Sequence, residues 1–219
     1  MKMKKLNFLL SAASLIVLTG CNSPKTDGAH VEEPSHTKDS VTTAKPDEVP
    51  MDSAAMAKAW NENRMPGEMH KWMATANGKW TAEMSFRMSP DEPLSPPSKA
   101  DVETRMIMEG RYQETTYKGK MMGMDFEGKE IMAYDNAKKK FISTFIDNTT
   151  TGLMYMEGTY DEASNTINFT GDITDPATGK KMDYRQELKF IDDKNQLLSA
   201  YDKKDGKEFK SMEIKLTRK

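Results

Sequence analysis

Cysteine is nearly absent from this sequence: the chain has one, Cys21, in 219 residues. A single cysteine forms no disulfide within the chain and cannot supply the cysteine pairs of structural zinc sites. Histidine is scarce as well, because His30 and His36 precede the region in which folded elements are expected. That leaves His70 as the only imidazole in the expected domain, and a zinc site built on histidine needs further ligands. The sequence therefore predicts no metal site and no cofactor.

The patterns that mark catalytic nucleophiles are missing too. There is no G-x-S-x-G elbow, no S-x-x-K at the start of a helix in the domain, and no glycine-rich nucleotide loop. Carboxylates are plentiful enough for a glycosidase pair, but most lie beside lysines in expected turns, which is typical of a solvated surface. His70 stands next to Lys71 and is interpreted as a residue on the polar face of a helix rather than a base. We expect no enzyme and no catalytic residues.

An excess of positive charge is also lacking. Lys and Arg number 32 against 34 Asp and Glu, so the formal net charge is −2. Domains that bind nucleic acid usually carry a basic patch, and so do domains that grip anionic lipid directly. We expect neither kind of partner.

The N-terminus is what the sequence describes best. A short cationic start with three lysines, an apolar run over 6–17 and small residues before Cys21 have the layout of a secretory signal over 1–20. The apolar run is shorter than the roughly 20 residues that span a bilayer. Leu18-Thr19-Gly20-Cys21 resembles the lipobox of bacterial lipoproteins, so we expect cleavage before Cys21 and acyl chains, such as palmitate, on that cysteine. Cleavage removes three lysines and no acid, leaving 29 basic against 34 acidic residues and a net charge of −5.

The expected location is the cell envelope. Asn22 and Ser23, which follow the cysteine, do not resemble an Asp-type inner-membrane retention signal, so the periplasmic face of the outer membrane is favoured. Residues 22–50 contain four prolines and no Leu, Ile, Phe, Tyr or Trp, so this segment cannot bury enough apolar surface to fold. We expect the lipidated cysteine and a disordered tether over 21–51, with an average reach of about 30 Å, and a folded domain over 52–219.

The domain is expected to be mainly β. Two short helices are predicted first, one from Ser53 to about Asn61 and one that starts near Pro66 and stops at Asn77-Gly78. From Gly78 onward apolar residues alternate with polar ones, as in half-buried strands. The expected strands lie near 80–88, 101–108, 111–120, 129–135, 140–147, 153–161, 165–173, 182–190, 196–202 and 212–216. About ten strands without a long helix between them predict an antiparallel meander that forms a barrel or half-barrel.

From about residue 60 to 219 the chain resembles a bacterial family catalogued as domain of unknown function 1579. The resemblance lies in the order and spacing of short turn-like segments. They are Trp60, Pro66-Gly67-Glu68 with His70-Lys71, Gly78-Lys79-Trp80, Gly110-Arg111-Tyr112, Gly123 with Phe126-Glu127-Gly128, Tyr134-Asp135, Gly158 to Asp161, Asp175-Pro176 with Thr178-Gly179-Lys180, and Asp205 to Glu208 with Met212-Glu213. The resemblance implies a lipocalin-like antiparallel barrel in an exported protein, with no established activity.

The interior of such a barrel is the candidate site. The inward positions of the clearest strands are Trp80, Met84, Phe86, Tyr184, Gln186 and Leu188. Gln186 falls at an otherwise apolar position, and a buried amide needs a partner from the protein or from a ligand. An interior of this kind suits a small apolar or amphipathic ligand, although small barrels often have filled interiors. Two hypotheses follow: a non-enzymatic binding module, or an interaction lipoprotein that acts through its surface and has a packed interior.

Methionine is unusually frequent, with 19 in the chain. Met121, Met122 and Met124 lie in an expected loop, and the pairs Met106/Met108 and Met154/Met156 are expected to share strand faces. Thioethers are soft ligands that suit Cu(I), so copper binding is a third hypothesis. Methionine is also an adaptable filler of cores and pockets, and i, i+2 pairs on a strand favour that explanation.

Overall fold

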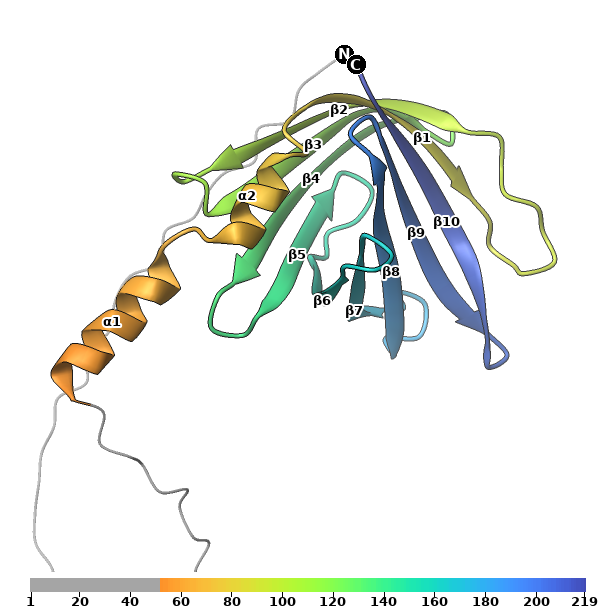
Figure 1. Ribbon diagram of the computed structural model, residues 1–219. Coiled ribbons are helices and arrows are strands. Elements are labelled where there is room, and N and C mark those ends of the chain that lie inside the picture. The colour runs from red at the N-terminus through yellow and green to blue at the C-terminus, as the bar shows by residue number, and fades with distance from the viewer. Residues whose placement is uncertain (1–51) are drawn as a thin grey trace, which may run out of the picture. The chain divides into compact units, whose positions relative to one another are not determined.

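The computed structural model describes residues 52–219 (Figure 1). The predicted signal peptide, the lipidation of Cys21 and the predicted tether over 21–51 lie outside the described residues. Two helices come first: α1 (Ser53–Arg64) and α2 (Glu68–Ala74). Ten strands follow: β1 (Gly78–Phe86), β2 (Ser98–Ile107), β3 (Tyr112–Met121), β4 (Met124–Asp135), β5 (Lys140–Asp147), β6 (Met154–Asp161), β7 (Thr166–Thr174), β8 (Lys181–Asp192), β9 (Asn195–Lys204) and β10 (Lys207–Arg218). None of the helices in this part of the chain has the length and apolar character needed to cross a membrane.

The strands form a closed antiparallel barrel in which each pairs with its neighbours in sequence, and β1 pairs with β10 to complete the ring. The predicted ten-strand meander is therefore confirmed, and closure decides between barrel and half-barrel. Across the closing seam Met84 pairs with Ile214 and Ala82 with Leu216. Closure leaves no strand edge with unpaired backbone groups, which is the physical advantage of a barrel.

Alternation along the strands places one set of side chains inside. In β1, Trp80, Ala82 and Met84 are almost completely buried, as expected for a strand whose side chains point alternately inward and outward. Tight turns fix the register between neighbours. Met122 (φ 51°) and Gly123 (φ 84°) join β3 to β4, a left-handed pair typical of hairpin turns, so Met121 pairs with Met124 in the sheet.

Two sequence predictions about methionines are wrong in detail. Met88 lies beyond the end of β1 and is 80% exposed, because the strand ends at Phe86. Met108 does not share a face with Met106, because β2 ends at Ile107 and Met108 adopts a left-handed turn conformation.

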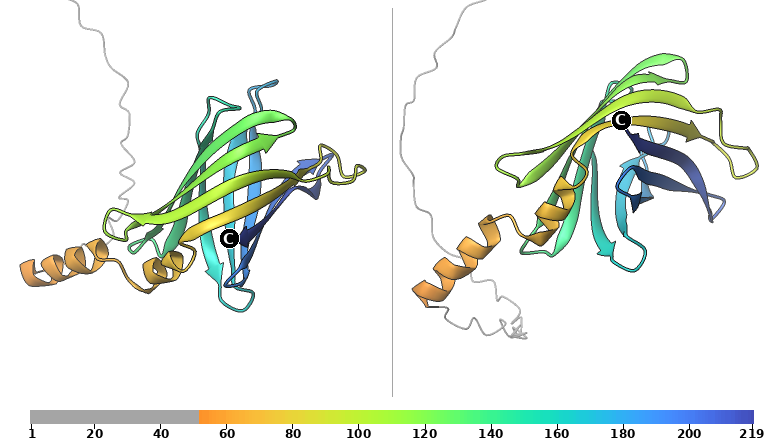
Figure 2. Two further views of the ribbon diagram at one scale, coloured as in Figure 1. Left: turned by 90° about the horizontal axis from the view of Figure 1, so that it is seen from above. Right: turned by 45° about the horizontal axis from the view of Figure 1, so that its top comes forward.

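Helix α2 closes one end of the barrel. Trp72 reaches the rings of Phe141, Tyr160 and Phe190, with centroid distances of 5.7, 4.8 and 4.3 Å. Met73 is fully buried, and its carbonyl accepts a hydrogen bond from the side-chain amide of Gln113 in β3. By contrast α1 buries none of its residues and runs away from the barrel in both orientations of Figure 2.

His70 differs from its predicted place on a polar helix face. It is 6% exposed, and its ring lies edge-on to Tyr134, 6.0 Å away between centroids. Its Nδ1 accepts a hydrogen bond from the backbone N–H of Gly67. Burial lowers the pKa of this imidazole, so it is a neutral packing residue. The buried face of α2 therefore includes His70 as well as Met73.

Candidate functional site

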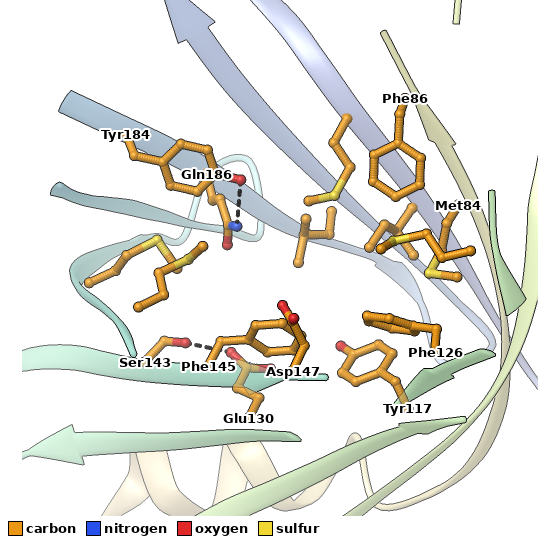
Figure 3. Close-up of a pocket in the computed structure, with 16 residues that line it drawn as sticks. Met84, Phe86, Tyr117, Phe126, Glu130, Ser143, Phe145, Asp147, Tyr184 and Gln186 are labelled. Atoms are coloured by element: carbon orange, nitrogen blue, oxygen red, sulfur yellow. Dashed lines mark hydrogen bonds between the residues drawn. The ribbon is translucent and has the colours of Figure 1, made fainter. Parts of the chain in front are cut away.

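The barrel contains a cavity of about 220 Å³ in the half away from α2 (Figure 3). Strand β4 shows the arrangement: Tyr134 lies at the α2 end, and Phe126 and Glu130 line the cavity further along. The middle of the barrel, around Trp80, Met132 and Leu188, is nearly filled and leaves only about 20 Å³. The interior is thus open in the half away from α2 and packed in the middle, so each of the two predicted alternatives describes one part of the barrel.

Most of the cavity wall is apolar. Aromatic rings and methionines dominate it. The full lining comes from eight of the strands and is Met84, Phe86, Tyr117, Met121, Phe126, Glu130, Ser143, Phe145, Asp147, Met154, Met156, Tyr184, Gln186, Leu198, Met212 and Ile214. Glycines on inward positions make room for the rings. A Cβ at Gly128 would stand 2.7 Å from Cζ of Phe145, so the glycine allows Phe145 to lie against β4.

The most unusual lining residue is Glu130, a carboxyl inside the barrel. Its Oε1 accepts a hydrogen bond of 2.6 Å from the hydroxyl of Ser143 in β5, and Ser143 itself is 1% exposed. Burial raises the pKa of Glu130, and the hydrogen bond from Ser143 opposes this only in part. Burial, helped by the nearby charge of Glu130, also raises the pKa of Tyr117. Glu130 borders both the cavity and the filled middle, so it forms part of the cavity floor.

A second polar pair lies across the cavity from Glu130 (Figure 3). The side-chain amide of Gln186 donates a hydrogen bond of 3.2 Å to the phenolic oxygen of Tyr184. Burial raises the pKa of Tyr184 to about 12, so this phenol stays neutral at physiological pH. The amide therefore has a partner within the protein, and its carbonyl oxygen is a hydrogen-bond acceptor on the cavity wall.

The predicted site residues divide between the two halves of the interior. Met84, Phe86, Tyr184 and Gln186 line the cavity. Trp80 and Leu188 have the predicted inward direction but lie in the filled middle, where the indole N–H of Trp80 donates to the carbonyl of Ala76. They support the barrel rather than border the space.

Glu130 and Ser143 are not among the site residues predicted from the sequence. Glu130 lies in a strand next to Lys129, so it is an exception to the prediction that most carboxylates lie beside lysines on a solvated surface. The alternation of β4 contained the signal, because Glu130 has the same parity as Met132 and Tyr134. Ser143 likewise has the parity of Phe141 and faces Met132 in the pairing of β4 with β5.

The methionines and the metal hypothesis can be placed as well. Met154 and Met156 both face the cavity, while Met122 and Met124 are exposed at the β3–β4 turn. Within residues 52–219 no group of three or more His, Cys, Asp and Glu side chains is arranged to hold a metal ion.

Comparison with known proteins adds the following. A solved structure of a redesigned beta barrel aligns with 70% of this chain and 99% of its own, at 13% sequence identity and a TM-score of 0.35. No curated protein matches the chain. The model of a family of proteins of unknown function, DUF1579, matches residues 65–218 and confirms the resemblance drawn from the sequence. The match spans well over half of the sequence, and the chain therefore belongs to the DUF1579 family.

Proposed function

We propose that this protein is a lipid-anchored envelope protein whose barrel binds a small apolar or amphipathic molecule without transforming it. The observation that carries the binding role is the cavity of about 220 Å³ inside a closed barrel. Its lining combines many apolar side chains with a few polar groups, which is the usual composition of a small-molecule site. The volume lies below the roughly 300–1,000 Å³ that is usual for ligand pockets, so the ligand is small.

The direct test is native mass spectrometry of the protein purified from its own host. A ligand that leaves on mild activation and that adds a reproducible mass supports binding. A ligand-free protein that also fails to take up small amphiphiles would contradict it, and would favour the alternative of a lipoprotein acting through its outer surface.

A matched pair of variants locates binding in the cavity. Met154 lines it, whereas its neighbour Tyr155 is 43% exposed on the outer face of the same strand. Met154→Trp fills part of the cavity and is expected to abolish the bound mass, and Tyr155→Trp is expected to retain it. Circular dichroism establishes that both variants are folded. Equal binding by both would place the ligand elsewhere.

The lipid anchor is tested separately. Metabolic labelling with a fatty acid is expected to mark the wild-type chain and not Cys21→Ser, because the thiol of Cys21 is the proposed attachment point. Two or more acyl chains would suffice for stable anchoring. Lipid that persists on the variant would contradict the proposal, whatever the barrel binds.

Copper is a second candidate ligand, because five methionines line the cavity: Met84, Met121, Met154, Met156 and Met212. Thioether sulfur suits Cu(I). Titration of Cu(I) under reducing conditions, against a competing chelator, tests this candidate, and failure to compete would remove it. We favour the organic ligand because the same wall carries aromatic rings and a carboxyl.

A further inference from the structure

The ionisable side chains with a charge in the cavity wall are all acidic. Two carboxyl side chains, Glu130 and Asp147, line it, and within residues 52–219 no lysine, arginine or histidine does. An anionic head group would therefore meet no cation inside the barrel. A charge without a partner in an apolar interior is very costly, so the cavity disfavours carboxylate ligands such as fatty acids.

Glu130 is built to meet a donor from the cavity. Ser143 supplies a hydrogen bond to Oε1, and no residue among 52–219 hydrogen-bonds to Oε2. Oε2 is therefore accessible from the cavity, because no fully buried side-chain oxygen or nitrogen of these residues lacks a hydrogen-bond partner. A carboxylate accepts hydrogen bonds at both oxygens, so one acceptor remains for a ligand.

Aromatic rings surround the same space. Tyr117 and Phe145 lie edge to face with centroids 6.0 Å apart, and Phe145 is paired with Glu130 across β4 and β5. Ring faces attract cations, most strongly where water is excluded. Carboxyl and rings together make the electrostatic environment that an ammonium group prefers.

Deepening the binding function proposed above, on which this inference rests, we propose that the preferred ligand is an amphiphile with a protonated amine. Its ammonium group pairs with Glu130 on the cavity floor, and its apolar part lies among the methionines and phenylalanines. A buried ion pair is favourable only when remaining hydrogen-bonding groups are satisfied. Ser143 already provides for one oxygen of Glu130, and the ammonium would provide for the other.

Binding is expected to be linked to protons. Burial raises the pKa of Glu130, which favours the protonated carboxyl in the empty barrel, and an ammonium partner would lower the pKa again. The other titratable groups facing the space are Tyr117 from β3, Asp147 from β5 and Tyr184 from β8. At pH values below the pKa of the empty site, amine binding should thus release a proton from Glu130, and it should strengthen as pH rises toward that pKa.

The test compares three probes of equal chain length: octylamine, octan-1-ol and octanoate. The full chain is used with Cys21→Ser, so that no attached acyl chain competes for the cavity. Isothermal titration calorimetry at neutral pH is expected to show octylamine binding at least about tenfold more tightly than octanol. The difference in affinity reflects the one charge-assisted hydrogen bond that only the amine makes. Octanoate should bind most weakly.

Two carboxyl variants assign the preference. Glu130→Gln keeps the shape and removes the charge, and is expected to lose the amine preference while still binding octanol. Glu127→Gln removes an exposed carboxyl of the same strand, outside the cavity lining, and is expected to keep the preference. If Glu130→Gln does not fold, proton release in the Cys21→Ser chain replaces it, measured from the heat of octylamine binding in buffers of different ionisation enthalpy.

The outcomes separate the two levels of the proposal. Binding of octanol or octanoate as tightly as octylamine overturns the amine preference and leaves the binding function standing. An amine preference that survives Glu130→Gln, or octylamine binding that releases no proton at any pH tested between acid and neutral, overturns the role of Glu130. If none of the three probes binds, the binding function fails as well.

Discussion

Glu130 illustrates how one buried carboxyl sets a pH dependence for the barrel. Burial raises its pKa above the ordinary 4.5, so the folded state holds this proton more tightly than the unfolded state does. The resulting stabilisation is complete below about pH 4.5 and is lost as pH rises through the folded-state pKa. We expect Glu130→Gln, which cannot ionise, to be more stable than wild type at pH 8, with the difference shrinking toward pH 4.5.

Urea unfolding at several pH values measures this difference. Glu127→Gln is the matched control, because Glu127 lies on the same strand with a side chain that is 67% exposed and near Lys118. Removing that exposed charge should change stability by no more than about 0.5 kcal/mol at either pH. A Glu130→Gln variant that parallels wild type over the whole range would show that Glu130 is not held as the structure indicates.

Gly158 gives a second prediction for a single residue. A Cβ there would stand 2.6 Å from Cδ1 of Phe169 and 2.9 Å from Cγ2 of Ile167, and both neighbours are buried. Gly158→Ala should destabilise the barrel by about 1–3 kcal/mol, as overpacking of a core does. Gly152→Ala, with nothing within 4 Å of the added atom, should leave the urea midpoint nearly unchanged. Equal midpoints would contradict the close packing of β6 on β7.

The inward-facing residues show how much of the site can be predicted from the sequence. Parity along a strand identifies Met84, Gln186 and even Glu130 as inward, because alternation follows from strand geometry alone. Parity does not tell which inward residues border a cavity. Trp80 and Met84 have the same parity, yet Trp80 lies in the filled middle and Met84 lines the cavity. Which inward residues border a cavity depends on how the side chains of all ten strands and α2 fill the interior together.

Among the elements, α2 shows the same division. Its position is predicted by Pro66 and Asn77-Gly78, which mark where the helix begins and ends. That it closes the barrel end, and buries His70 in doing so, depends on contacts with Phe141, Tyr160 and Phe190, which lie about 70–120 residues further along the chain. Such long-range contacts leave no periodic mark in the sequence of the helix itself.

The closing role of α2 predicts the effect of removing Trp72. Trp72→Ala should cost about 2–3 kcal/mol, somewhat less than the truncation of a fully buried Trp, because Trp72 is half-buried. Trp60→Ala is the control on α1, where the side chain is 67% exposed, and should change stability by no more than about 0.5 kcal/mol. Urea unfolding measures both. Similar losses for the two variants would contradict the different roles assigned to the two helices.

At the scale of the whole molecule, closure joins the first strand to the last. Met84 and Ile214, which are paired across the seam, are far apart in sequence, so the barrel is complete only when β10 has been added. The core residues all lie between Met69 and Leu216. Because α1 buries nothing, the cooperative unit should need nothing that precedes residue 52.

We therefore expect residues 52–219, produced alone, to fold and to unfold in a single transition with the urea midpoint of the full Cys21→Ser chain. Removal of 207–219 from the same fragment should abolish folding, because it deletes β10, uncovers the edges of β1 and β9 and takes Phe209, Ile214 and Leu216 out of the core. Unpaired edges also favour aggregation. Circular dichroism and size-exclusion chromatography distinguish a folded monomer from an aggregated chain. A stable monomer without β10 would mean that closure contributes little, and that the cavity wall formed by Met212 and Ile214 is dispensable to the fold.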